Sequence, residues 1–128
     1  MQHLQYESSW DKALSTQDRM NIERIFNDTK HQNDSKILFT PIKEAFNHNQ
    51  DLLVTVLVHN FTSEPFLFQN VRLRYSIQGE LVGEHIFHLP RLKISAQVSM
   101  PWTFIFPKGN YRTRTSIENG RLEVSENV

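Results

Sequence analysis

A proline-bracketed stretch in the last third of the chain constrains the fold most strongly. It places Trp102, Phe104 and Phe106 at every second position, between Pro101 and Pro107. Side chains alternate between the two faces of a β-strand, so the three rings share one face and can bury a large apolar area there. Proline has no N–H to donate, so the two prolines mark where regular sheet pairing begins and stops. The stretch therefore predicts a short strand whose aromatic face lies in a core.

The same two-residue period runs through most of the chain after a polar connector at residues 31–36. Pro41 indicates an edge strand, whereas the alternate apolar side chains of residues 52–60 are typical of a central one. Strands are predicted at residues 37–42, 52–60, 66–68, 71–77, 81–89, 92–94 and 111–117, in addition to the stretch around Trp102. About seven short strands at roughly ten-residue spacing predict an immunoglobulin-like antiparallel β-sandwich.

The dipeptide Asn119-Gly120 predicts a hairpin close to the end of the chain. Asn-Gly is the strongest short-range signal for a type I′ turn. A two-residue loop at this point would place Glu118 opposite Arg121 and Ile117 opposite Leu122. Charge would then pair with charge and apolar with apolar.

Residues 1–30 are expected to be helical. The Ser15 hydroxyl can accept a hydrogen bond from an unpaired amide of the first turn, where Asp18 also favours the positive end of the helix. The predicted buried face repeats at three- and four-residue spacing and comprises Ile22, Ile25, Phe26 and Thr29. Trp10 and Leu14 are four residues apart and indicate a short preceding turn or helix.

Length and composition predict one cytoplasmic domain. The 128 residues fit a single domain, with a helical segment at 1–30 and a sandwich at 37–124. A net charge of zero gives no general attraction to nucleic acid or to an anionic membrane. The lack of cysteine excludes disulfides and thiolate nucleophiles and suits a reducing compartment. The first residues are polar, unlike a signal peptide, and the apolar run at 52–58 is too short to insert in a membrane.

The zero net charge conceals an uneven distribution. Residues 1–70 carry 6 basic and 9 acidic side chains, whereas residues 71–114 carry 7 basic and 2 acidic ones. Strand alternation points four arginines outward, and these are the candidate partner-binding residues: Arg72, Arg74, Arg112 and Arg114. Such a basic face could bind an acidic protein partner. The favoured alternative is that the acidic helix covers it through Asp18, Glu23 and Asp28.

Motifs for catalysis or cofactor binding are not evident. His85 and His88 are three apart, which on a strand directs them to opposite faces and does not favour a shared metal. No Gly-x-Ser-x-Gly nucleophile motif occurs, and the four glycines do not cluster before a helix as phosphate-binding loops require. The residues predict no enzyme, no cofactor and no metal site.

Several motifs together resemble the SLAP domain of Firmicutes. They are the opening Trp10-Asp11-x-Ala13-Leu14, the strand end His59-Asn60-Phe61-Thr62, the strand Phe87-His88-Leu89 and the run Ser99-x-Pro101-Trp102-Thr103-Phe104-Ile105-Phe106. The resemblance covers most of the chain. It implies a role linked to S-layer assembly and an accessory Sec export system, and it implies no enzymatic activity.

Two functions are therefore considered. The first is a non-enzymatic protein-interaction module that is accessory to the export or assembly of a cell-surface protein. The alternative is a small-ligand or carbohydrate-binding sandwich, since such folds often present aromatic rings to sugars. Phe61, Phe66 and Phe68 lie close to one loop and would form its platform.

Overall fold

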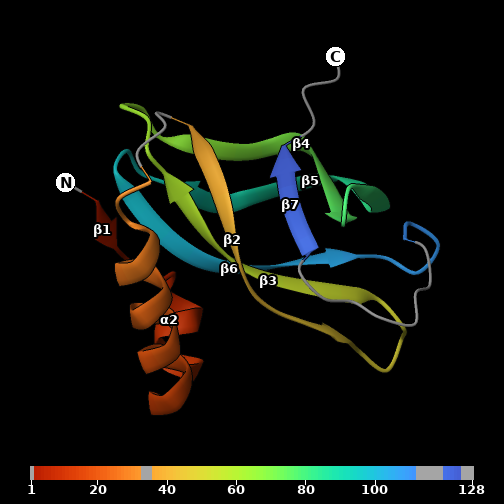
Figure 1. Cartoon of the computed structure of the whole chain (residues 1–128), viewed down its shortest axis with the longest axis horizontal. Helices are drawn as coiled ribbons and strands as arrows, with labels where there is room; N and C mark the ends of the chain where they lie inside the picture. The colour runs from red at the N-terminus through yellow and green to blue at the C-terminus, as the bar shows by residue number, and fades with distance from the viewer. Residues whose placement is uncertain (1, 33–35, 112–119, 125–128) are drawn as a thin grey trace.

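The protein is a β-sandwich with helices packed on one side (Figure 1). The computed structural model describes residues 2–32, 36–111 and 120–124. Its elements are β1 (His3–Leu4), α1 (Ser8–Ala13), α2 (Thr16–Thr29), β2 (Ile37–Phe46), β3 (Leu52–Asn60), β4 (Phe66–Ile77), β5 (Glu80–Ile94), β6 (Val98–Phe106) and β7 (Gly120–Val124).

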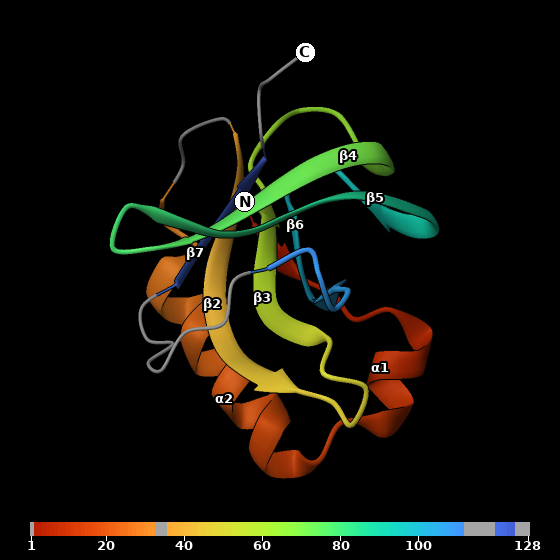
Figure 2. The ribbon, with the colours of Figure 1, turned by 90° about the vertical axis from the view of Figure 1, so that its right-hand side faces the viewer.

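The strands form two sheets. Sheet A has the order β1-β6-β3-β2 and sheet B the order β5-β4-β7. Neighbouring strands are antiparallel except for β1, which pairs in parallel with the start of β6. The helices, sheet A and sheet B follow one another as layers in Figure 2. This arrangement confirms the predicted mainly β sandwich with an N-terminal helix.

The core lies between the sheets and is rich in phenylalanine. The central strand β3 begins and ends where the sequence predicts and is buried on both faces. Val54, Val56, Leu73, Tyr75 and Phe104 are buried in one cluster. Trp102 is only partly buried: it packs at the margin of the cluster and stacks on Trp10 of α1, with ring centroids 6.3 Å apart.

The outer face of sheet A carries the helical layer. The Ser15 Oγ accepts a hydrogen bond from the Asp18 N–H at 3.0 Å, which confirms the predicted cap of α2. Ile22 and Phe26 are buried against Leu57 of β3. The predicted apolar stripe of the helix therefore faces the sheet.

Strand boundaries differ from the prediction where prolines and long-range pairing decide them. The strands predicted at 81–89 and 92–94 are one strand, β5, which continues through Pro90. Pro41 does lie on an edge strand, β2, next to a register shift. The predicted pairs Glu118–Arg121 and Ile117–Leu122 lie partly outside the described residues. Within them, β7 pairs with β4.

Candidate functional site

The outer face of sheet B presents two of the four candidate arginines. Leu73 and Tyr75 point into the core, so Arg72 and Arg74 point to solvent, as predicted. Their side chains are 40% and 46% exposed. The other two candidates, Arg112 and Arg114, lie outside the described residues. The helices lie beyond sheet A, on the far side from this face (Figure 2).

Strand register places acidic side chains beside these arginines. Arg74 stands opposite Glu84 of β5 on one side and Glu123 of β7 on the other. Glu84 Oε2 lies 3.7 Å from Arg72 Nη1 and 3.9 Å from Arg74 Nε. The face is therefore a mixed-charge surface at this point, which a count of charges along the chain does not reveal.

The favoured prediction that the acidic helix covers these arginines is wrong. Helix α2 packs on β2 and β3 of sheet A, whereas Arg72 and Arg74 belong to sheet B. On the helix, Asp28 forms an exposed i,i+4 pair with Arg24 at 3.8 Å. The physical reason is that the apolar stripe of α2 packs against Leu57 of sheet A. Exposed charge pairs contribute too little free energy to move the helix from this contact to sheet B.

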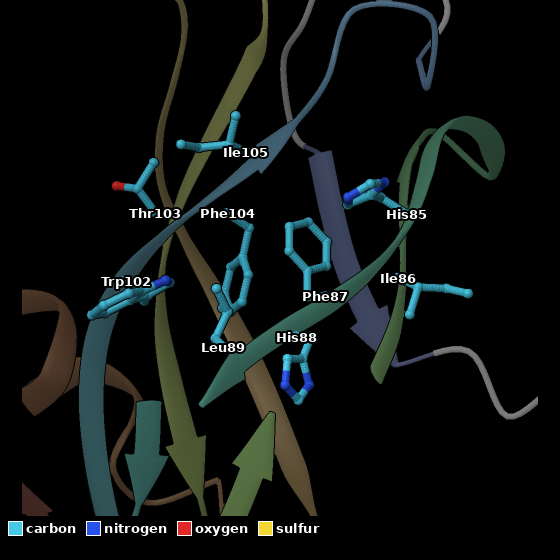
Figure 3. Close-up of a pocket in the computed structure, with 9 residues that line it drawn as sticks. All are labelled: His85, Ile86, Phe87, His88, Leu89, Trp102, Thr103, Phe104 and Ile105. Atoms are coloured by element: carbon cyan, nitrogen blue, oxygen red, sulfur yellow. The ribbon is translucent and has the colours of Figure 1, made fainter. Parts of the chain in front are cut away.

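A groove adjoins this face where β5 and β6 border the sandwich. It has a volume of about 300 Å³ and is lined by residues 85–89 and 102–105. Phe87, Leu89, Trp102 and Phe104 gather between the two strands in Figure 3. Ile86 and Ile105 border the groove and are 48% and 46% exposed. The site therefore combines an apolar floor with two strand edges.

The two histidines of the groove differ in environment. The His85 ring is half-buried and meets the Phe87 ring edge-on at 4.9 Å, while His88 is exposed. Among residues 2–32, 36–111 and 120–124, no three His, Cys, Asp or Glu side chains gather in a way that could hold a metal ion.

A third histidine, His59, is fully buried between α2 and sheet A. Its Nε2 lies 2.9 Å from Thr29 Oγ1, and its Nδ1 lies 2.6 Å from Ser99 Oγ. The Thr29 hydroxyl donates its single hydrogen to the Ile25 carbonyl at 2.7 Å, so it can only accept from the ring. We therefore assign the proton to Nε2 and make Nδ1 the acceptor of the Ser99 hydroxyl hydrogen.

The same network extends to the N-terminal segment. Ser99 Oγ accepts from Gln2 Nε2 at 3.0 Å, so donors and acceptors match from Gln2 through Ser99 and His59 to Thr29. Burial lowers the pKa of His59 from its ordinary 6.5 to about 4. The neutral imidazole thus ties the segment before α1, strand β6, strand β3 and helix α2 together.

The neighbouring Asn60 joins sheet A to the end of β5. Its Nδ2 donates to the carbonyls of Ile94 at 2.9 Å and Glu64 at 2.8 Å, and its Oδ1 accepts from the Thr62 N–H at 3.0 Å. The motif His59-Asn60-Phe61-Thr62 is therefore a structural junction. The sequence showed the motif, but its distant partners Thr29, Ile94 and Ser99 lie 30 to 40 residues away in the chain and carry no local signal.

The predicted aromatic platform for carbohydrate does not form. Phe61 and Phe68 are 4% and 0% exposed, and Phe66 meets the Phe68 ring edge-on at 4.9 Å. Phe61 stacks on the buried His59 ring at 5.0 Å. These rings are part of the packing, because large apolar side chains on inward strand positions are more stable there than in water.

A buried tyrosine meets a half-buried glutamate at the opposite opening of the sandwich. Burial raises the pKa of the Tyr75 hydroxyl, and the nearby Glu44 carboxylate raises it further. Burial also raises the pKa of Glu44, and its hydrogen bond with Tyr75 opposes that rise. The Tyr75 ring lies against Gly120, where a Cβ would collide with it. The glycine is therefore required by packing.

A family model described as a SLAP domain matches residues 4–125. No curated protein and no solved structure matches the chain. Within the part of the chain that the structure describes, no helix is long and apolar enough to cross a membrane.

Proposed function

This chain belongs to the SLAP domain family, and from that membership we propose that it is a non-enzymatic protein-interaction module. It acts in the cytoplasm as an accessory to the export or assembly of a cell-surface protein such as an S-layer protein. The name of the matching family model refers to the accessory Sec system, which supports this setting.

The outer face of sheet B, which no described element covers, is the observation that carries the proposal. Sheet A has its outer face packed by α2, whereas sheet B leaves Arg72 and Arg74 in solvent beside the exposed Ile86. Arginine and large apolar side chains are enriched at protein interfaces. A partner that presents carboxylates can bind the guanidinium groups in a bidentate manner. The carboxylates of the partner must compete with Glu84 for the two guanidinium groups. The position of the partner's carboxylates therefore matters as well as their charge.

The polar groups of the interior support a binding role over a catalytic one. His59, Ser99 and Thr29 satisfy one another in a closed network between elements, and Asn60 is used in the same way. These groups hold the layers in place and are turned away from the groove. The protein therefore offers a rigid surface that a partner can recognise.

Affinity capture with matched variants tests the proposal. The double variant Arg72→Gln/Arg74→Gln should lose a partner that the wild type captures from lysate of its own cells. Glutamine avoids adding carboxylates beside Glu84, so its stability should stay within about 1 kcal/mol of the wild type. Arg24→Gln on α2 removes an arginine from a more exposed charge pair on the opposite side of the molecule and is the control. Equal capture by both variants, or no partner for the wild type, would contradict the proposal. Cell fractionation tests the cytoplasmic location.

A further inference from the structure

Among the residues that the structure describes, none pairs with part of the backbone of β5 at the edge of sheet B. The Glu84 N–H points to this edge, because it donates to the Asn110 carbonyl at 3.2 Å. Register with β4 runs without a shift from Gly83 to Phe87. The register shift that follows adds its extra residue to β4, since Phe87 pairs with Val71 and Leu89 pairs with Phe68, so β5 keeps its alternation through His88. Because edge-facing residues alternate in an antiparallel ladder, Ile86 and His88 also direct their N–H and C=O groups outward.

Both ends of this unpaired part are closed. At one end, Asn110 already accepts from Glu84, and Gly83 forms an isolated bridge with Tyr111. At the other end, Pro90 begins the register shift between Leu89 and Lys93, and proline has no N–H to donate. The edge is thus limited to Ile86 and His88, with room for a short strand.

The groove next to this edge can take the side chains of such a strand. Phe87, Leu89, Trp102 and Phe104 form its apolar lining, and its volume of about 300 Å³ suits a few aliphatic side chains (Figure 3). The existing bridge at Tyr111 is antiparallel, which shows the direction that this edge accepts.

Charge identifies the chemistry of the occupant. The exposed Arg91 and Lys93 follow Pro90, and residues 85–93 contain no carboxylate. The nearby Glu7 at the cap of α1 interacts electrostatically with Arg91. An antiparallel strand has its N-terminal end beside Arg91 and Lys93, so acidic residues at that end complement the site.

We propose that the edge of β5 at Ile86 and His88 binds an extended segment of a partner protein as an added antiparallel strand. The segment has acidic residues at its N-terminal end, followed by alternating aliphatic residues. Main-chain hydrogen bonds supply affinity and the groove supplies specificity, as in other cases of strand addition. The inference rests on the proposed protein-binding function.

The facing edge of β6 is a poorer site. The Gln5 N–H donates to the Ser99 carbonyl, so Pro101 and Pro107 both fall on edge-facing positions. Trp10 of α1 stacks on Trp102 beside this edge, and β6 carries no charged residue. Charge complementarity therefore places the added strand on β5.

Synthetic peptides and amide exchange test this binding mode. The probe is a peptide of two aspartates followed by alternating threonine and valine, added to the whole protein. The expected result is saturable binding with slowed exchange of the Ile86 and His88 amides. The reversed peptide, with aspartates at the C-terminal end, should bind about three- to tenfold more weakly, which corresponds to about 0.7 to 1.4 kcal/mol.

Two matched changes separate backbone from side-chain recognition. His88→Pro removes an edge-facing N–H that the β4 ladder does not use and should weaken binding about tenfold or more, whereas His88→Ala keeps the N–H and should bind normally. If His88→Pro does not fold, a peptide N-methylated at its β5-facing residues replaces it and should fail to bind. Equal binding of the N-methylated peptide, protection of other amides, or no binding at millimolar peptide would overturn the inference. Partner capture through Arg72 and Arg74 would still stand in that case, so the two proposals fail separately.

Discussion

The two faces of sheet A are buried by different means. Toward sheet B, Phe104 is fully buried and meets the rings of Phe68 at 5.4 Å and Phe87 at 5.3 Å. Toward α2, a small apolar cluster around Leu57 is joined by the polar network of His59. Alternate residues of β3 point to opposite faces of the sheet, so this strand contributes side chains to both contacts.

This difference separates two kinds of stability. Burial of aromatic rings depends on apolar area and packing and is insensitive to pH. The helix–sheet contact contains a histidine whose hydrogen bonds are satisfied only in its neutral form. We therefore expect substitutions in the sandwich to cost the most, and acid to act mainly through the helical layer.

The largest effect is expected from Phe104→Ala. Phe104 is 0% exposed and contacts rings from three other strands, including Phe39 of β2. Deletion of the ring leaves a cavity and should lower the free energy of unfolding by about 3–5 kcal/mol. Chemical denaturation measures the change. Ile105→Ala, at the exposed neighbouring position, should cost less than about 1 kcal/mol. Similar costs at both positions would remove the distinction between the faces of β6.

The next largest effect is expected from acid, which should lower the free energy of unfolding by protonating His59. Its pKa is about 4 in the folded protein, against 6.5 when unfolded, so the unfolded chain takes up the proton first as the pH falls. The stabilisation is complete above pH 6.5 and is lost as the pH falls toward 4, by up to about 3 kcal/mol. Denaturation at a series of pH values gives this curve.

A variant isolates the contribution of His59 from that of the carboxylates. His59→Gln should be less stable than the wild type at pH 7, and the difference should shrink as the pH falls to 4. The exposed His48→Gln provides the control and should follow the wild type throughout. A constant difference between wild type and His59→Gln would show that the ring titrates normally and that the helical layer is not acid-sensitive.

Much of the fold was predictable because its signals are local. Residues 52–60 alternate clearly, and the cap at Ser15 needs only its own helix. The strand β1 was missed, because two residues carry no period and are held by distant residues of β6. Two strands were predicted on either side of Pro90, but β5 continues through it on an edge strand at a register shift, where proline is tolerated.

The candidate site was less predictable, because it depends on register. The outward direction of Arg72 and Arg74 follows from alternation and is confirmed. Their neighbour Glu84 is set by the pairing of β4 with β5, and the covering of sheet A is set by the match between Leu57 and the helix stripe. Neither can be read from charge totals along the chain.

A smaller effect is expected at the start of α2. Ser15→Ala removes the acceptor of the Asp18 N–H and should cost about 1 kcal/mol. Ser15→Asp retains an acceptor and should restore most of the stability. The loss should appear as faster amide exchange in α2 and leave β3 unchanged if the helical layer is the weaker of the two. Equal acceleration in β3 would show that helix and sandwich open together.

The smallest effect concerns the place where the two regions meet. Trp102 lies at the margin of the sandwich core and stacks on Trp10 of α1 at 6.3 Å with an interplanar angle of 29°. Such a partly exposed stacked pair should have a coupling energy of about 0.5 kcal/mol. A double-mutant cycle with Trp10→Ala and Trp102→Ala measures it. Because Trp102 is only partly buried, its own replacement should cost less than that of Phe104. A coupling energy of zero would mean that the contact between Trp10 and Trp102 does not contribute to stability. If Trp102→Ala costs as much as Phe104→Ala, Trp102 belongs to the core and the core reaches as far as α1.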